Sequence, residues 1–304
     1  MKKTSNLTKL ENIDLSNEVA LVSPTDTPFT TLLMQNGLVA PANATTITWR
    51  EKTLDPDRKT PKKEAADASN VTTSQRIEKS NNQQIFERTA EVSGTLQAIN
   101  VPGIGSEMAQ EVYDAMVTAK IDLEYYAIQG TLANETASDP RQMNGIINLI
   151  NAANKFSPAD AGGLITVDDI KKAFRLPWDH GVGGDKIVMV NADTKEYIDK
   201  LFKTDEGVTL PALQGGGNIV GLTADRVHTN YGTGNIILNR HIPAETFLVF
   251  DLQSFKLRPL RPMQSKRLAE NGDYSREMVF GEYSLELKNS YSGSVITGVK
   301  GIQA

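Results

Sequence analysis

The segment from residue 55 to residue 70 most constrains the fold, because it contains no large apolar side chain. Such a segment cannot bury enough apolar surface to offset the conformational entropy that folding costs. Charges of both signs alternate from position 50 to position 67: the basic residues are Arg50, Lys52, Arg58, Lys59, Lys62 and Lys63, and the acidic ones are Glu51, Asp55, Asp57, Glu64 and Asp67. This segment is therefore either a solvated loop or an arm that another surface orders.

Strand patterns on both sides favour an arm. Thr45–Trp49 is β-branched and aromatic, and residues 71–96 show a looser strand pattern that includes Phe86 and Val92. The simplest structure is a long two-stranded hairpin with a charged tip. Because an isolated hairpin is marginally stable in water, it needs a neighbouring surface. The mixed charges favour ion pairs with another subunit over nucleic acid, which selects basic residues.

A long amphipathic helix follows the arm. Ser106 is a suitable N-cap, with Glu107 in the first turn and Gly130 at the end. Its length of about 24 residues corresponds to roughly 36 Å. Apolar residues recur every three or four positions and form one apolar stripe over six turns, which consists of Met108, Val112, Met116, Ala119, Leu123 and Tyr126.

A compact α/β region is predicted after residue 165. Thr166–Asp169 has the pattern of a capping box and opens a helix that we expect to end at Pro177. Lys186–Val190 has the composition of a buried strand, and Asp193 opens a second helix. Further short strands are expected at 219–222 and 236–238.

The C-terminal part is predicted to be β. Apolar and polar residues alternate from Tyr283 to Lys288, which indicates a half-buried strand. Phe247–Phe250 and Ser294–Val299 are possible partner strands. A second charged loop runs from Lys266 to Arg276.

The composition provides little for catalysis. The chain has no cysteine and three histidines, His180, His228 and His241, which are not at metal-binding spacing. The glycine clusters at 181–184 and 232–234 precede strands, whereas a phosphate-binding loop follows one. A two-carboxylate glycosidase could be hidden among 37 acidic residues, but sequence spacing cannot identify such a pair. We predict no catalytic residue, no cofactor and no metal site.

Charge and hydropathy limit the partners. The net charge of −5 argues against nonspecific binding of nucleic acid. No run of about 18 apolar residues occurs, so we expect no membrane span.

Three local patterns, in this order, carry a family resemblance. They are Thr27-Pro28-Phe29 followed by Leu32-Leu33, the strand ending at Trp49 with charges after it, and the C-terminal run Gly272-Asp273-Tyr274, Glu282–Asn289 and Gly298. With the order of the elements, they resemble the major capsid (major head) protein of tailed double-stranded DNA phages. The resemblance implies the α+β Hong Kong 97-type capsid fold, with an N-arm, an extended E-loop hairpin, a P-domain with a long spine helix and β layer, and an α/β A-domain.

Carried over by position, the resemblance divides the chain into five parts. They are an N-terminal arm (1–48), the E-loop (49–96), the first part of the P-domain (97–165) with the spine helix (106–130), the A-domain (166–245) and the closing β layer of the P-domain (246–304).

The resemblance also implies which residues contact other subunits. On the E-loop they are Arg50, Glu51, Lys52, Asp55, Asp57, Arg58, Lys59, Lys62, Lys63 and Glu64. The loop near the capsomer axis has Gly215, Gly216 and Gly217. The P-domain loop has Lys266, Arg267, Glu270 and Arg276.

The implied function is structural. Copies would form hexamers and pentamers of an icosahedral head enclosing double-stranded DNA, assembled in the cytoplasm of a bacterial host and retained in the virion. Further partners would be scaffolding, portal and decoration proteins, and the packaged double-stranded DNA, without sequence-specific binding. A tail-tube subunit or adhesin is the alternative, although the six-turn helix argues against those mostly β proteins. A glycosidase-type enzyme is the least favoured alternative.

Overall fold

The computed structural model describes residues 24–54, 61, 63–65, 67, 74–99, 106–204 and 226–300. The chain divides into two compact units, which we describe separately. The first consists of residues 1–25, 86–122 and 263–281, and the second contains the rest of the chain.

A six-stranded sheet forms the core of the second unit. Its order is β4 (Lys155–Phe156), β11 (Gly293–Thr297), β8 (Thr246–Phe250), β5 (Lys186–Val190), β7 (Gly232–Leu238) and β6 (Arg226–Thr229). The pairing is mixed, because β5 runs parallel to β7 and antiparallel to β8. The apolar runs predicted at 186–190 and 247–250 are thus central strands, which explains why both lack polar alternation.

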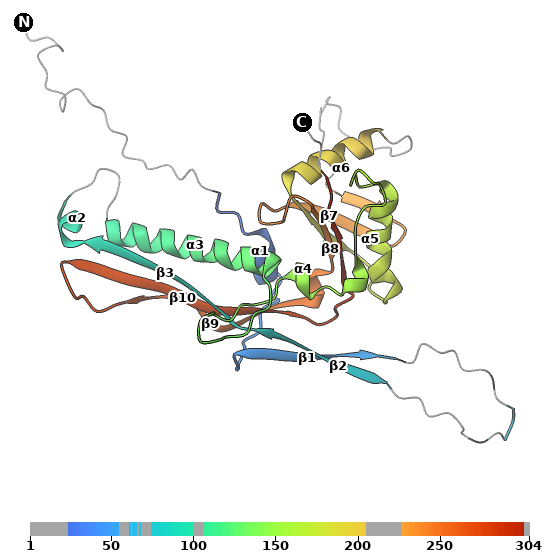
Figure 1. Cartoon of the computed structure of the whole chain (residues 1–304), viewed down its shortest axis with the longest axis horizontal. Coiled ribbons are helices and arrows are strands. Elements are labelled where there is room, and N and C mark those ends of the chain that lie inside the picture. The colour runs from blue at the N-terminus through green and yellow to red at the C-terminus, as the bar shows by residue number, and fades with distance from the viewer. Residues whose placement is uncertain are drawn as a thin grey trace, which may run out of the picture. The chain divides into compact units, whose positions relative to one another are not determined.

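Helices α5 (Val167–Asp179) and α6 (Ala192–Thr204) pack with one face of this sheet, and Figure 1 shows them beside β7 and β8. A buried cluster joins Phe174 of α5 and Ile198 of α6 to Val188 and Phe247. The predicted capping box is confirmed, because the Thr166 side chain accepts a bond from the Asp169 amide and Asp169 bonds back to the Thr166 amide.

The prediction that this helix ends at Pro177 is wrong. The helix continues to Asp179, with Pro177 in its last turn. Proline has no N–H to donate to the carbonyl four residues earlier, which belongs to Ala173. The buried Ser294 hydroxyl donates to that carbonyl instead, at 2.6 Å. A residue more than 100 positions away therefore makes the proline tolerable.

The other face of the sheet packs against α1 (Pro28–Gln35), the helix predicted from Phe29 and Leu33. Phe29 lies edge-on to Phe250 and Phe255, with ring centroids 5.6 and 5.9 Å apart. Gly37 ends this segment with a φ of +66°, a conformation that glycine adopts without strain.

A three-stranded sheet has the order β3 (Gln84–Ser93), β10 (Tyr274–Leu287), β9 (Phe255–Arg267). The alternation predicted over 283–288 holds at Glu286, which is half-buried, and at Lys288, which is exposed, whereas Ser284 on the same face is buried. The preceding Glu282 is buried as well. Glu282 is paired with Arg141 and Arg261, and these ion pairs allow its burial.

The predicted long helix is confirmed as α3 (Glu107–Gln129), with the Ser106 hydroxyl accepting a bond from the Ala109 amide. Its apolar stripe is only half-buried at Met108, Val112 and Met116. In the first unit α3 lies beside β3 (Figure 1), and Arg88 pairs with Asp122 at 2.6 Å.

Short elements complete the fold: α2 (Gly94–Ala98), α4 (Ile146–Leu149) and the 3₁₀ turns η3 (Ala152–Asn154) and η4 (Leu252–Ser254). The strand predicted at 219–222 lies outside the described residues. Among the described residues, no helix is long and apolar enough to span a bilayer.

Candidate assembly interface

The predicted arm is a two-stranded antiparallel ribbon of β1 (Thr46–Thr53) and β2 (Gln75–Asn82) in the second unit. Its pairs run from Thr46 opposite Asn82 to Thr53 opposite Gln75. Five of the ten contact residues predicted for the E-loop lie outside the described residues: Asp55, Asp57, Arg58, Lys59 and Lys62. Lys63 and Glu64 are exposed.

One face of the ribbon is exposed and mostly basic. Arg50 lies opposite Glu78, and Lys52 lies opposite Arg76. Like charges directly opposite each other destabilise a strand pair, commonly by a few tenths of a kcal/mol. Within the described part of the chain, these four side chains form no ion pair. We call Arg50, Lys52 and Arg76 the cationic face.

The opposite face of the ribbon holds it to the rest of the second unit. Ile47 is buried and Trp49 is half-buried. The Glu51 carboxylate accepts bonds from the Ser290 amide at 2.7 Å and the Ser290 hydroxyl at 2.9 Å. Glu51, predicted as an intersubunit contact, is therefore bonded within its own chain, and both its oxygens have partners.

Four consecutive amide side chains are buried where the ribbon meets β3: Asn81, Asn82, Gln83 and Gln84. We call them the amide junction. Asn81 donates to the carbonyls of Asn144 and Leu285 at 3.0 and 2.7 Å and accepts from the Asn144 amide at 2.7 Å. Asn82 donates to the Ala133 carbonyl and the Asn134 side chain, both at 2.9 Å.

The other two amides extend the network. Gln83 donates to the Arg258 carbonyl at 3.1 Å, and Gln84 accepts from the Met143 amide at 3.1 Å. Arg141 donates to the Gln83 carbonyl at 2.7 Å. The base of the arm is thus fixed by directional polar bonds.

The sequence reasoning missed this junction. Asparagine is depleted in strands, and amides are seldom buried, so a run of four at the end of a strand pattern was a usable signal. Burial of all four requires partners for all of them.

The Thr27-Pro28-Phe29 pattern has its structural basis in Glu124. Proline suits the first turn of α1, but the Thr27 side chain makes no cap bond. Instead, the fully buried Glu124 carboxylate accepts from the amides of Phe29 and Thr30, both at 2.8 Å. Asn239 donates to the same carboxylate at 2.7 Å. Glu124 was also missed, because nothing in its local pattern separates it from the surface acids of α3.

The residues predicted for the P-domain loop lie in the first unit, mainly in ion pairs. Arg267 pairs with Glu270, and this hydrogen bond lowers the pKa of the exposed Glu270 carboxyl. Arg276 pairs with Glu91 of β3, which raises the pKa of the Arg276 guanidinium. Lys266 is exposed. Gly215, Gly216 and Gly217, predicted for the capsomer axis, lie outside the described residues.

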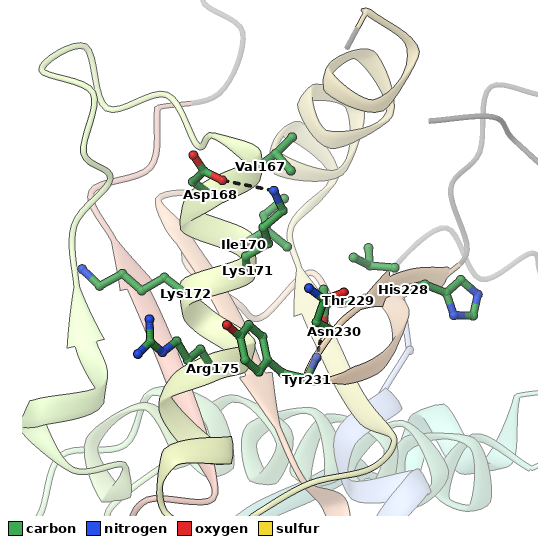
Figure 2. A pocket seen from close by; sticks show the side chains of 11 residues that line it. Val167, Asp168, Ile170, Lys171, Lys172, Arg175, His228, Thr229, Asn230 and Tyr231 are labelled. Atoms are coloured by element: carbon green, nitrogen blue, oxygen red, sulfur yellow. Dashed lines mark hydrogen bonds and ion pairs between the residues drawn. The ribbon is translucent and has the colours of Figure 1, made fainter. Parts of the chain in front are cut away.

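A groove of about 450 Å³ lies between α5 and the β6–β7 hairpin, as Figure 2 shows. Lys171 is 3.2 Å from Asp168, the one carboxylate among its 11 lining residues, so these residues do not supply the acid pair of a glycosidase. In the part of the chain that the structure covers, no group of three His, Asp or Glu could hold a metal ion.

The model of one protein family, described as the SU10 major capsid protein, matches residues 2–300. The chain belongs to the SU10 major capsid protein family. It is thus a major capsid protein, as the resemblance implied. No curated protein matched the sequence.

Solved structures show the same fold over nearly the whole chain. The cyanophage A-1(L) capsid has a TM-score of 0.70 at 12% identity, covering 98% of both chains. The capsid of a native GTA particle has a TM-score of 0.66 at 12% identity, and the match covers 95% of both chains. The SrpI encapsulin of Synechococcus elongatus PCC 7942 has a TM-score of 0.62 at 10% identity, and the match covers 97% of this chain and 95% of that one. The Hong Kong 97-type fold is thereby confirmed, and the comparisons give no support to a tail-tube subunit, adhesin or glycosidase.

Proposed function

We propose that copies of this major capsid protein assemble into hexamers and pentamers, and that these close an icosahedral phage head around double-stranded DNA. The match of the capsid family model over residues 2–300 is the main support. Assembly would take place in the cytoplasm of the bacterial host, and the product would remain in the virion.

The ribbon supports self-association. A two-stranded ribbon is marginal alone, and this one is held at its base while exposing a basic face with no intrachain ion pair among the described residues. A ring of identical subunits requires two different, complementary surfaces on each copy. The arm supplies one of them, and repetition around a closed shell strengthens contacts that are weak singly.

The predicted contact sets remain part of this proposal. They are the E-loop charges, the glycines at the capsomer axis and the P-domain loop, of which Lys266 is exposed without an ion pair among the described residues. Scaffolding, portal and decoration proteins are proposed as further partners, together with packaged double-stranded DNA without sequence-specific binding. The role proposed for the chain is structural, not enzymatic.

Electron microscopy and analytical ultracentrifugation of the purified chain test the proposal. We expect rings or closed particles, either from the chain alone or with its scaffold. A chain that stays monomeric at high concentration under both conditions would contradict the proposed function.

A further inference from the structure

The chain contains three Asn-Gly dipeptides: Asn36-Gly37, Asn144-Gly145 and Asn271-Gly272. In such a dipeptide the backbone nitrogen of the glycine can attack the asparagine side chain, because glycine has no Cβ to shield that nitrogen. The three dipeptides share this local chemistry. A difference in reactivity between them therefore comes from the fold.

Asn36-Gly37 follows α1 and is exposed, but its reacting groups already have partners. The Asn36 side chain donates to the Leu32 carbonyl at 2.8 Å. The Gly37 amide donates to the Met34 carbonyl at 3.1 Å. The nitrogen that would attack is thus engaged in a hydrogen bond, and the side chain is held at the preceding turn of the helix.

Asn144-Gly145 is protected by burial as well as by hydrogen bonds. Gly145 is buried, and its amide donates to the Gly130 carbonyl at 2.9 Å. The backbone N–H of Asn144 donates to the side chain of Asn81 in the amide junction at 2.7 Å. This segment must open before the two groups of the dipeptide can react.

Asn271-Gly272 has neither form of protection. It lies at the tip between β9 and β10, where both residues and the following Asp273 are exposed. Among the hydrogen bonds of the described residues, none engages the Gly272 amide or the Asn271 side chain. The tip is held beside them, since the Asp273 carbonyl accepts from the Gly94 amide at 3.0 Å and the Gly272 carbonyl accepts from the Tyr274 amide at 2.9 Å.

We propose that Asn271 is a deamidation site of the folded chain. The Gly272 nitrogen attacks Cγ of Asn271, so that an N–Cγ bond forms and the Cγ–Nδ2 bond breaks. The side-chain nitrogen leaves as ammonia and takes the proton of the Gly272 amide. Water then opens the resulting succinimide ring at either carbonyl, which leaves aspartate or isoaspartate. The only co-reactant is water.

The product changes the charge of the predicted P-domain loop. A carboxylate at position 271 would directly follow Glu270 and lie two residues before Asp273, and one added acid changes the net charge of −5 to −6. Isoaspartate also lengthens the main chain between β9 and β10 by one carbon atom. Its effect on contacts between subunits rests on the proposed function, whereas the deamidation itself does not.

Peptide mapping of the full-length chain tests the proposal. The chain is incubated in mildly alkaline buffer, at concentrations too low for assembly, both folded and in guanidinium chloride. Mass spectrometry follows conversion at each dipeptide, and trypsin releases residues 268–276 as a peptide whose only asparagine is Asn271.

In the folded chain we expect Asn271 to convert about fivefold faster than Asn36 and about tenfold faster than Asn144, because the hydrogen bonds of the other two must open first. In guanidinium chloride this protection is lost, and the three rates should agree within about threefold.

Asn271→Gln is the matched control, because the longer side chain forms the cyclic imide far more slowly. This exposed substitution should leave the circular dichroism unchanged. The wild type should accumulate an acidic species on ion-exchange chromatography, and its 268–276 peptide should contain both aspartate and isoaspartate. The variant should accumulate much less of this species.

Three results would overturn the proposal. They are equal conversion of all three dipeptides in the folded chain, an Asn271 that stays intact when folded but converts in guanidinium chloride, and aspartate without isoaspartate, which indicates direct hydrolysis of the side chain. All measurements use unassembled chain. They therefore stand whether or not the chain forms shells, and failure of assembly would count only against the proposed function.

Discussion

Glu124 is a fully buried carboxylate whose described partners are three neutral N–H groups. The side chain at the N-cap of a helix commonly accepts bonds from the first amides of that helix. For α1, Glu124 does this from another helix, α3. One residue therefore connects α1, α3 and Asn239, the residue after β7. Replacing it affects three segments at once.

We predict that Glu124→Gln destabilises the folded chain by about 1–3 kcal/mol, because the amide nitrogen would face a backbone N–H and leave a buried donor unpaired. Urea unfolding at concentrations too low for assembly measures the change. Glu111→Gln on the exposed side of the same helix is the matched control, with an expected effect within about 0.5 kcal/mol. Equal effects of the two variants would contradict the capping role.

Lys186 is a second buried charge, 1% exposed, and its ammonium group donates to the Val182 carbonyl at 3.0 Å. Burial lowers the pKa of this lysine, while Asp251 and Asp185 act in the opposite direction. The unfolded chain therefore binds more protons than the folded chain between the lowered pKa and the ordinary value of 10.5. The contribution of Lys186 therefore makes the free energy of unfolding of the wild type increase as pH rises through that window.

Lys186→Met removes this titration. We compare the free energy of unfolding of the variant with that of the wild type at each pH. The difference, variant minus wild type, should be highest near pH 7 and should fall as pH approaches 10.5. Chemical denaturation across this pH range measures it, with the exposed Lys171→Met as the baseline for removing a surface lysine. A difference that rises with pH would contradict the assigned direction of the pKa shift.

At the scale of single elements, α5 shows how a distant residue changes a helix end. The Pro177 ring leaves the Ala173 carbonyl without its helical donor, and the Ser294 hydroxyl of β11 donates to it. The sheet and the helix are thereby joined at the point where the helix would otherwise stop.

We predict non-additive effects in a cycle of Ser294→Ala and Pro177→Ala. Ser294→Ala alone should cost about 1–3 kcal/mol, because the buried carbonyl loses its donor. In the Pro177→Ala background a backbone N–H can replace that donor, so the same change should cost less by about 1 kcal/mol. Denaturant unfolding of the four proteins measures the coupling, and strictly additive costs would show that the hydroxyl does not substitute for the helical bond.

The elements that the sequence predicted best are those defined by local periodicity. The α3 helix, the α5 capping box and the central strands follow from residues within a few positions of one another. The end of α5 was mispredicted at Pro177, because the hydroxyl that replaces the missing helical donor belongs to Ser294, which is distant in sequence. The amide junction and Glu124 were missed for the same reason: their partners, which include Phe29 of α1 and Leu285 of β10, are distant in sequence and only the folded chain brings them close.

At the scale of the whole molecule, the arm is the part that the isolated chain needs least for folding. Its base is anchored by the amide junction and Glu51, whereas residues 54–74 connect the two strands. Its removal therefore separates folding from assembly.

We predict that replacing residues 54–74 by Asn-Gly preserves the monomer fold and abolishes assembly. Asn-Gly closes a two-residue hairpin directly between Thr53 and Gln75, which are opposite each other. Circular dichroism should be nearly unchanged, with thermal unfolding within a few degrees of the wild type, and electron microscopy should show no particles. An unfolded product would mean that the arm belongs to the core, and normal particles would mean that its tip is dispensable.

The amide junction has a consequence for the geometry of the shell. Apolar packing is tolerant of rotation, whereas hydrogen bonds to Asn144, Leu285 and Ala133 hold only in one orientation. We infer that the junction sets the direction in which the arm extends from the rest of the second unit, and with it the local curvature of a shell in which neighbouring copies meet. Removing the side-chain hydrogen bonds of Asn81 should leave subunits able to associate but should broaden the distribution of particle diameters. Control of particle size would then be lost before the ability to assemble.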